Sequence, residues 1–157
     1  PLPAEEKAQI VARAKLCGVL KFTDEELAYY FGERDIPSGV EAVFAACAHA
    51  QLVAVTMGRN GSFLYTRRRH IYSAAYEVPV TDTTGAGDSF MGALLYGLAR
   101  CEGKIETLSE QALEKLGDFC NACASFSTMG HGSLLSMGTA ADAEDLMRSR
   151  ARIRAAR

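Results

Sequence analysis

Two carboxylates flank a short run of small residues in the middle of the chain, and this stretch is the best suited to chemistry. It reads Asp82-Thr83-Thr84-Gly85-Ala86-Gly87-Asp88, and an apolar segment follows from Phe90 to Ala99. Glycines let a backbone approach a ligand closely, and the first N–H groups of a following helix lack partners within that helix. Such a terminus binds anions, most often phosphate. An anion cradle beside the carboxylate of Asp88 predicts phosphoryl transfer to a hydroxyl group.

A simpler interpretation of the same stretch needs no ligand. Asp-Thr-Thr-Gly can form a turn, and an acidic residue such as Asp88 suits the first turn of any helix. The full string is more specific, and it resembles the signature of the ribokinase-like (PfkB) carbohydrate and nucleoside kinases. The resemblance implies that Asp88 is the general base. It also implies that Gly85, Ala86 and Gly87 form the anion hole for the phosphoryl group.

A second motif lies near the N-terminus, in the string Lys21-Phe22-Thr23-Asp24-Glu25-Glu26-Leu27. Thr23 and Glu26 have the spacing of a capping box, which predicts the start of a helix that ends near Gly32. The string also resembles the segment that carries the family's Asn-x-x-Glu motif, in the form found in fructokinases. This implies that Glu26 organises Mg²⁺-bound water and phosphate, although Thr23 stands where the family often has asparagine.

A third motif, Thr56-x-Gly58-x-x-Gly61, connects two apolar runs. Periodicity alone predicts a β-hairpin with strands at 51–56 and 62–65. The motif also resembles the family segment that lines the nucleotide site, where Thr56, Gly58 and Gly61 would pass close to the phosphates and ribose of ATP. The basic residues 67–70 are expected to form a solvated hairpin turn.

Asn121 lies in the run Phe119-Cys120-Asn121-Ala122-Cys123-Ala124 of a long helix that is expected to begin at Ser109. A buried amide among small apolar residues needs a partner. The run resembles the Phe-Ala-Asn-Ala segment of fructokinases, which implies that Asn121 lies by the adenine of ATP. Cys120 and Cys123 have no second ligand pair at zinc-binding spacing, so we expect structural cysteines.

A stretch of small residues follows this helix, and the resemblance implies that it closes the nucleotide pocket and completes a cation site. The resemblance implies that Asp82 and the backbone of Thr84 hold an activating monovalent cation such as K⁺, for which oxygen ligands are apt. Alignment with the family places four further residues at matching positions. Gly130 and Gly132 are expected at the nucleotide, and Ser127 and Ser136 at the cation.

The composition is that of an ordinary globular protein. The 157 residues, 48% hydrophobic and 23% charged, suffice for one domain with a core. The net charge of −2 argues against a general binder of nucleic acid or membranes. We expect no signal peptide, and no apolar run reaches the roughly 18–20 residues of a membrane helix. With five cysteines, most in apolar helical surroundings, we expect a cytoplasmic protein.

Runs that favour strands alternate with runs that favour helices. This pattern predicts one α/β domain with a mostly parallel sheet covered by helices. Strands are expected at 17–22, 51–56, 62–65 and 76–81, and helices at 4–16, 24–32, 36–48, 85–100, 109–126 and 139–147. Ser38 is expected to cap the third of these helices and Thr139 the last. Residues 148–157 are expected to form a basic, solvated tail, with nucleic-acid binding as an alternative.

The resemblance covers residues 17–147, and it corresponds to only the C-terminal half of the ribokinase-like fold. Residues 1–147 are therefore interpreted as the nucleotide-binding part of a PfkB-type kinase domain. The family's N-terminal half, with its Gly-Gly substrate motif and β lid, is not in this sequence, which leaves part of the sheet with a bare edge. We expect a fragment of a longer enzyme, or a chain that forms a homodimer or pairs with a missing N-terminal half.

The expected function is ATP-dependent phosphorylation of a sugar hydroxyl, as in fructokinases and ribokinases, with ATP, Mg²⁺ and K⁺. There is no Gly-x-x-x-x-Gly-Lys loop that would indicate a P-loop kinase instead. Three alternatives stay open. They are a nucleoside kinase of the same family, a non-catalytic nucleotide-binding half-domain, and a protein that binds a metal through its cysteines.

Overall fold

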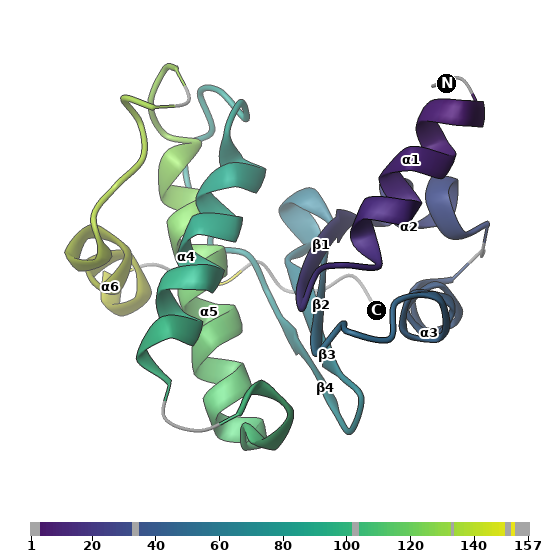
Figure 1. Cartoon of the computed structure of the whole chain (residues 1–157). Coiled ribbons are helices and arrows are strands. Elements are labelled where there is room, and N and C mark those ends of the chain that lie inside the picture. Colours follow the sequence, from purple (N-terminus) through teal and green to yellow (C-terminus); the bar gives the residue numbers. More distant parts are fainter. Residues whose placement is uncertain (1–3, 33–34, 102–103, 133, 150–151, 153–157) are drawn as a thin grey trace.

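The computed structural model describes residues 4–32, 35–101, 104–132, 134–149 and 152, and it has three layers (Figure 1). A sheet of four strands forms the middle layer. Helices α1, α2 and α3 cover one face, and α4, α5 and α6 lie on the other side (Figure 1). The α/β class is confirmed. No helix in the described ranges is both long and apolar enough to span a membrane.

The sheet has the strand order β1-β2-β3-β4 and mixed direction. The strands are β1 (Val19–Thr23), β2 (Leu52–Thr56), β3 (Ser62–Thr66) and β4 (His70–Ser73). Strand β1 pairs with β2 in parallel, whereas β2–β3 and β3–β4 are antiparallel. The expectation of a mostly parallel sheet is therefore not met in the described residues. The two antiparallel connections are short hairpins, and parallel strands need a crossover of about a dozen residues or more.

Three helices precede the β2–β3 hairpin in the chain. They are α1 (Ala4–Ala14), α2 (Asp24–Phe31) and α3 (Ile36–Ala46). The capping box at the start of α2 is confirmed, because Thr23 N–H donates to Glu26 Oε2 over 2.8 Å and Glu26 N–H to Thr23 Oγ1 over 3.0 Å. The expected cap of α3 was wrong. Asp35 is the N-cap and accepts from the amide of Ser38 over 2.9 Å, so Ser38 lies inside the first turn.

The C-terminal half is mainly helical. Helix α4 spans Ala86–Arg100, α5 spans Glu110–Ser127 and α6 spans Ala140–Ser149, with short 3₁₀ turns η1 (Gly58–Asn60) and η2 (Ile105–Thr107). Ser109 caps α5 as predicted, because its Oγ accepts from the amide of Ala112 over 3.1 Å. Thr139 caps α6 in the same way, accepting from the amide of Asp142 over 3.3 Å.

The expected strand at 76–81 does not form. Tyr76 makes one isolated bridge, to Arg152, and the rest of the segment belongs to no strand. Pro79 has no N–H to give to a ladder. The segment instead follows α5, where Tyr76 N–H donates to Ser125 Oγ over 3.2 Å and Thr81 N–H to Thr128 O over 2.7 Å. A loop on α5, not a strand, therefore leads into α4.

The alternation of side chains along β1 decides which of its residues reach the C-terminal helices. Leu20 and Phe22 are buried in the core formed with α1, α2 and α3. Val19 packs against the separate core formed with α4 and α5. Successive side chains of a strand point to opposite faces. Lys21 and Thr23 therefore face the same side as Val19, toward α4.

The basic tail is described only in part. Arg148 forms exposed ion pairs with Glu144 and Asp145 of its own helix α6. Arg152 pairs with Asp118 of α5 and lies over the ring of Tyr76. The remaining arginines of the tail lie outside the described residues. The division between a domain at 1–147 and a tail at 148–157 stays a prediction.

Candidate functional site

A cavity of about 850 Å³ opens between the sheet and the C-terminal helices. It lies where β1 and β2 end and α4 begins, which is the usual place for ligands in α/β sheets. Its volume is within the usual range for small-molecule sites. Its wall is formed by Lys21, Thr23, Thr56, Gly58, Arg59, Gly61, residues 75–78, Val80, Thr83, Ala86, Gly87, Phe90, Asn121, Ala124, Ser125, Thr128 and Arg152.

The α4 N-terminus forms one side of this cavity. Gly85 is the N-cap and has φ = 83°, a left-handed conformation that favours glycine. The amide of Ala86 donates to Thr83 O over 3.2 Å, so it is already occupied. Among the described residues, the amides of Gly85, Gly87 and Asp88 have no protein acceptor. The free donors of the turn are thus Gly85, Gly87 and Asp88, whereas the sequence had suggested Gly85, Ala86 and Gly87.

Asp88 is exposed and lies in the first turn of α4. Within the described part of the chain, its carboxylate forms no ion pair with a basic side chain. It is not part of the cavity wall, whereas its neighbour Gly87 is. The carboxylate therefore lies next to the cradle and open to solvent. A substrate hydroxyl outside the cavity can reach such a group, and a general base has to be within hydrogen-bond reach of that hydroxyl.

The end of β1 contributes two residues to the cavity wall, Lys21 and Thr23. Lys21 was missed as a site residue in the sequence, although it opens the quoted motif. The signal that could have found it is a lysine inside an otherwise apolar strand. Glu26 lies outside the wall, exposed, and one of its carboxylate oxygens holds the amide of Thr23 in the capping box.

The turn between β2 and β3 contributes Thr56, Gly58 and Gly61 to the wall. Gly61 has φ = 85°, and a Cβ added to it would lie 2.2 Å from the carbonyl oxygen of Ser73. Gly58 has φ = 53°, and a Cβ there would meet open space. A side chain at position 61 would therefore clash with the end of β4, whereas a Cβ at position 58 would meet no other atom.

Asn121 also lines the cavity, and it is 4% exposed. Its Nδ2 donates to Ser62 Oγ over 3.0 Å and to Ser73 O over 3.0 Å. Both donors of the side-chain amide therefore bind the sheet. Only the side-chain carbonyl oxygen is left for a ligand, and it can accept a hydrogen bond from an amine. Asn121 thus joins α5 to β3 and β4.

Three of the four residues expected at the cation, Asp82, Thr84 and Ser136, lie in two loops that meet above α4 and α5 (Figure 1). Asp82 Oδ1 accepts from the amide of Thr84 over 2.9 Å, and Oδ2 accepts from the amide of Gly132 over 3.3 Å. The bonds from Thr84 first, and then that from Gly132, lower the pKa of the Asp82 carboxyl below its usual value of 3.8. Ser136 Oγ donates to Gly132 O over 2.7 Å, so these residues form one connected loop pair.

Gly130, which was expected at the nucleotide, and Ser127, which was expected at the cation, differ in their relation to these loops. Gly130 is close to Ser136, since a Cβ added to it would lie 3.0 Å from Ser136 Cβ. Ser127 is buried at the end of α5 and donates to Ala124 O over 2.8 Å. Gly130 therefore belongs to the loop pair. The Ser127 hydroxyl is committed to its own helix, which makes it the least suited of the set to bind an ion.

Of the two cysteines of α5, Cys120 is buried and Cys123 is partly buried. Burial raises the pKa of Cys120, which has no exposed surface, and raises the pKa of Cys123 to about 11. Thiols of this kind stay protonated and are poor nucleophiles and metal ligands. In the described ranges no three His, Cys, Asp or Glu side chains are grouped closely enough to hold a metal ion.

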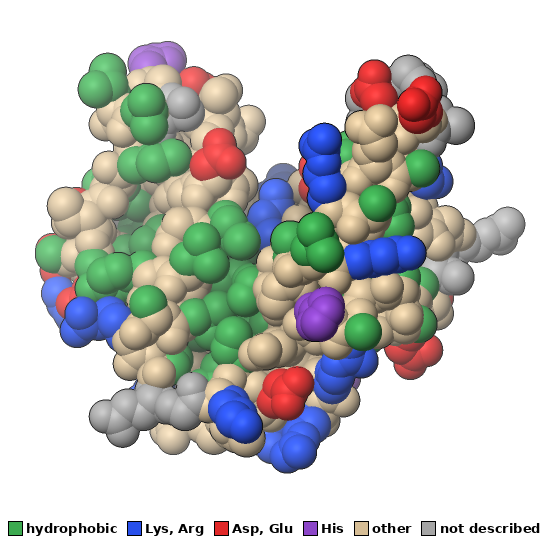
Figure 2. Space-filling model, viewed as in Figure 1, with side chains coloured by type: hydrophobic (Ala, Val, Ile, Leu, Met, Phe, Trp, Pro, Cys, Tyr) green, Lys and Arg blue, Asp and Glu red, His purple; other side chains and the backbone are tan. Residues whose placement is uncertain are grey.

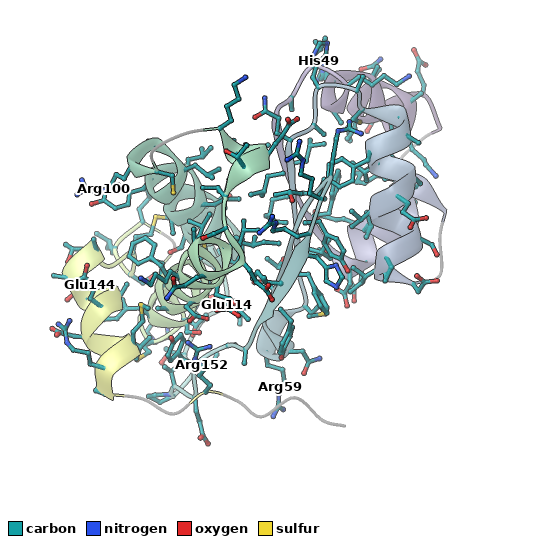
Figure 3. The ribbon with its side chains drawn as sticks, turned by 90° about the horizontal axis from the view of Figure 1, so that it is seen from below. His49, Arg59, Arg100, Glu114, Glu144 and Arg152 are labelled. Atoms are coloured by element: carbon teal, nitrogen blue, oxygen red, sulfur yellow. The ribbon has the colours of Figure 1, made fainter. Side chains whose placement is uncertain are left out.

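Arg152 is a second wall residue that sequence patterns missed. In Figure 3, seen from below, Arg152 lies beside α5 and Arg59 lies on the side of the sheet, while His49 is at the opposite end of the molecule. Arg59 and Arg152 both line the cavity. With Lys21 they give the wall three basic side chains against one acidic side chain, Glu77. The cavity is therefore suited to an anionic ligand.

The comparison with known proteins decides the family. A family model described as pfkB family carbohydrate kinase matches residues 1–140. The chain belongs to the pfkB family of carbohydrate kinases. The ribokinase-like fold is confirmed by solved structures of fructokinases. That of Xylella fastidiosa with bound ATP has a TM-score of 0.81 and 22% identity over 94% of this chain and 48% of that chain.

Fructokinases are prominent among the similar proteins. "Probable fructokinase-2" of Arabidopsis thaliana is 33% identical over 143 residues, which are 91% of this chain and 43% of that protein. Fructokinase-2 of Solanum lycopersicum is 32% identical and covers 94% of this chain and 44% of that protein. A double mutant of the Vibrio cholerae fructokinase, solved with fructose, ADP and a potassium ion, has a TM-score of 0.82 and 27% identity, covering 93% of this chain and 46% of that chain. The chain spans less than half the length of each.

Proposed function

We propose that this pfkB-family chain is the nucleotide-binding and catalytic part of an ATP-dependent kinase that phosphorylates a hydroxyl group of fructose or a similar sugar. The observation that carries the proposal is the α4 N-terminus. One of its unpaired amides, that of Gly87, lies at the wall of a cavity of about 850 Å³, and the exposed carboxylate of Asp88 lies in the same turn. The similar proteins named as fructokinases support a sugar as the substrate.

In the proposed reaction, the sugar hydroxyl attacks the γ-phosphorus of ATP. The new O–P bond forms as the bond to the β-phosphate oxygen breaks, which yields a sugar phosphate and ADP. Asp88 accepts the hydroxyl proton and later releases it to solvent. The free amides of Gly85 and Gly87 stabilise the charge on the phosphoryl oxygens during transfer. These amides are already oriented by the turn, so little reorganisation is needed.

The rest of ATP would occupy the cavity and contact its wall. We place the adenine by Asn121, whose carbonyl oxygen can accept from the exocyclic amine. The Thr56–Gly61 turn would lie along the ribose and phosphates, and the loop with Gly130 and Gly132 would close the pocket. Support comes from the position of the turn and of Asn121 in the cavity wall.

Two ions are part of the proposal, and the chain's residues fit both. Glu26 has a carboxylate oxygen beyond the one in the capping box, which suits a Mg²⁺-bound water, since Mg²⁺ keeps several waters and few protein ligands. Mg²⁺ would neutralise charge on the bound phosphates. The loop pair offers oxygens of Asp82, Gly132 and Ser136 for K⁺, with Thr84 contributing its backbone and Ser127 the least accessible group. The Vibrio cholerae fructokinase was solved with potassium.

The free edge of β1 bears on whether the chain works alone. Among the described strands, β1 pairs only with β2. Figure 2 shows hydrophobic side chains gathered over α4. Leu95 and Tyr96 of that helix are each 48% exposed. An open edge beside apolar surface favours pairing with further strands. We propose that the other half of the kinase fold covers it. If nothing covers this edge, the second candidate function applies, which is a nucleotide-binding half-domain without catalysis.

The test is Asp88→Asn in a protein that contains both halves of the fold, with transfer of labelled γ-phosphate from ATP to fructose as the readout. A general base contributes about 10²- to 10⁴-fold, so kcat is expected to fall by that factor while ATP affinity changes little. Asp24→Asn is the matched control, because Asp24 is an exposed acid in the first turn of α2. Unchanged turnover in Asp88→Asn would disprove the general-base role. Binding of ATP without any transfer by the wild type would support the non-catalytic alternative.

A further inference from the structure

The side chain of Lys21 reaches the N-terminus of α4, 66 positions further along the chain. A Cβ added to Gly87 would lie 3.1 Å from Lys21 Nζ. Both residues line the same cavity. Lys21 occupies the alternate position of β1 that faces α4, whereas its neighbours Leu20 and Phe22 are buried on the other side. The position of the ammonium group therefore follows from the direction of the strand and from the place where α4 begins.

This arrangement places two positive groups against each other. The first turn of a helix carries a partial positive charge, and the amides of Gly85 and Gly87 there have no protein acceptor in the described ranges. The ion pairs of the described residues involve Arg148 and Arg152, so no carboxylate neutralises Lys21 there. A partly buried ammonium beside a helix N-terminus is unfavourable without an anion between them. An anion held by both would remove that repulsion.

We propose that Lys21 is a catalytic residue that binds the terminal phosphoryl group of ATP, opposite the amides of Gly85 and Gly87. This rests on the proposed kinase function and adds a side-chain ligand to a cradle otherwise made of backbone. Lys21 contacts an oxygen of the γ-phosphoryl group, which bears three oxygens and the charge that shifts during transfer. Because ADP lacks that group, Lys21 distinguishes ATP from ADP.

The first experiment measures binding of Mg²⁺-ATP and Mg²⁺-ADP by titration calorimetry on the chain and its variants. The wild type is expected to bind ATP more tightly than ADP. Lys21→Met is expected to weaken ATP binding by about 10- to 100-fold, the size of a hydrogen bond to a charged group. ADP binding is expected to stay the same. Lys115→Met is the matched control, because Lys115 is exposed on α5 and is not in the cavity wall, so neither affinity should change.

The second experiment keeps the wild-type fold. The chain has five lysines, and their amines can be labelled with ¹³C-methyl groups and observed by NMR. The Lys21 signal, identified by its loss in Lys21→Arg, is expected to shift with ATP and to shift much less with ADP. This measurement also covers the case in which Lys21→Met does not fold.

The outcomes separate this inference from the proposed function. If the wild type binds ATP and Lys21→Met keeps its preference for ATP over ADP, the inference is wrong and the kinase proposal stands. Equal weakening of ATP and ADP would also overturn it, because Lys21 would then act on shared groups or on the fold. A Lys21 NMR signal that does not shift with ATP would also overturn the inference. A wild type that binds neither nucleotide overturns the proposed function and the inference together.

Discussion

Asn121→Ala tests how α5 is attached to the sheet at the cavity. The substitution removes the hydrogen bonds from Nδ2 to Ser62 Oγ and to Ser73 O, both 3.0 Å long. Each such bond contributes about 0.5–1.5 kcal/mol net, and a buried acceptor left without a partner costs about 1–3 kcal/mol. Ser62 has no exposed surface and Ser73 is 2% exposed, so water does not readily replace the amide. We expect a loss of about 2–4 kcal/mol in the free energy of unfolding.

Urea unfolding followed by circular dichroism measures this loss as a lower midpoint at unchanged slope. For a chain of this size the melting temperature should fall by about 4–16 °C, at 2–4 °C for each kcal/mol. Gln111→Ala is the control, because it removes an exposed amide from the same helix and should change stability by less than about 0.5 kcal/mol. A double-mutant cycle with Ser62→Ala should give a coupling energy of about 1 kcal/mol.

Two results would refute this reasoning. The first is an Asn121→Ala variant as stable as Gln111→Ala, which would mean that the two hydrogen bonds contribute nothing to stability. The second is strict additivity of Asn121→Ala and Ser62→Ala, since residues in direct contact should couple. In either case Asn121 would be held in place by packing, and its amide donors would be free for a ligand.

Two further changes test the turns around the sheet. Gly61→Ala should destabilise the protein by about 2 kcal/mol or more, because the new Cβ would lie 2.2 Å from Ser73 O and the φ of Gly61 is 85°. Gly58→Ala is the comparison: its Cβ would meet open space, so it should cost only about 1–2 kcal/mol of backbone strain. Equal melting temperatures of the two variants would contradict the clash at Gly61. Arg67 donates to the carbonyls of four residues at the end of α3 and the loop after it, so Arg67→Lys should cost about 1 kcal/mol by urea unfolding. Arg68→Lys, an exposed control, should cost nothing, and a matching loss there would refute the role of Arg67.

The sequence alone determined the features that depend on contacts within a few residues. The caps at Thr23, Ser109 and Thr139 are examples, and so is the start of α4 directly after Gly85. A cap joins a side chain to a backbone amide three positions away, so its signal is complete within one short string. The same local logic failed at Ser38, where a better cap, Asp35, lies three residues earlier.

Only the tertiary structure decided which distant residues share the cavity and in which direction the strands run. Lys21 meets Gly87, Asn121 bonds Ser62, and Arg152 reaches Asp118, although each pair is more than 30 positions apart. The segment at 76–81 has strand-like residues and still follows α5, because partners along the helix take its amides. Hydrophobic periodicity and short motifs carry no information on such partners, since long-range pairing depends on how whole elements pack.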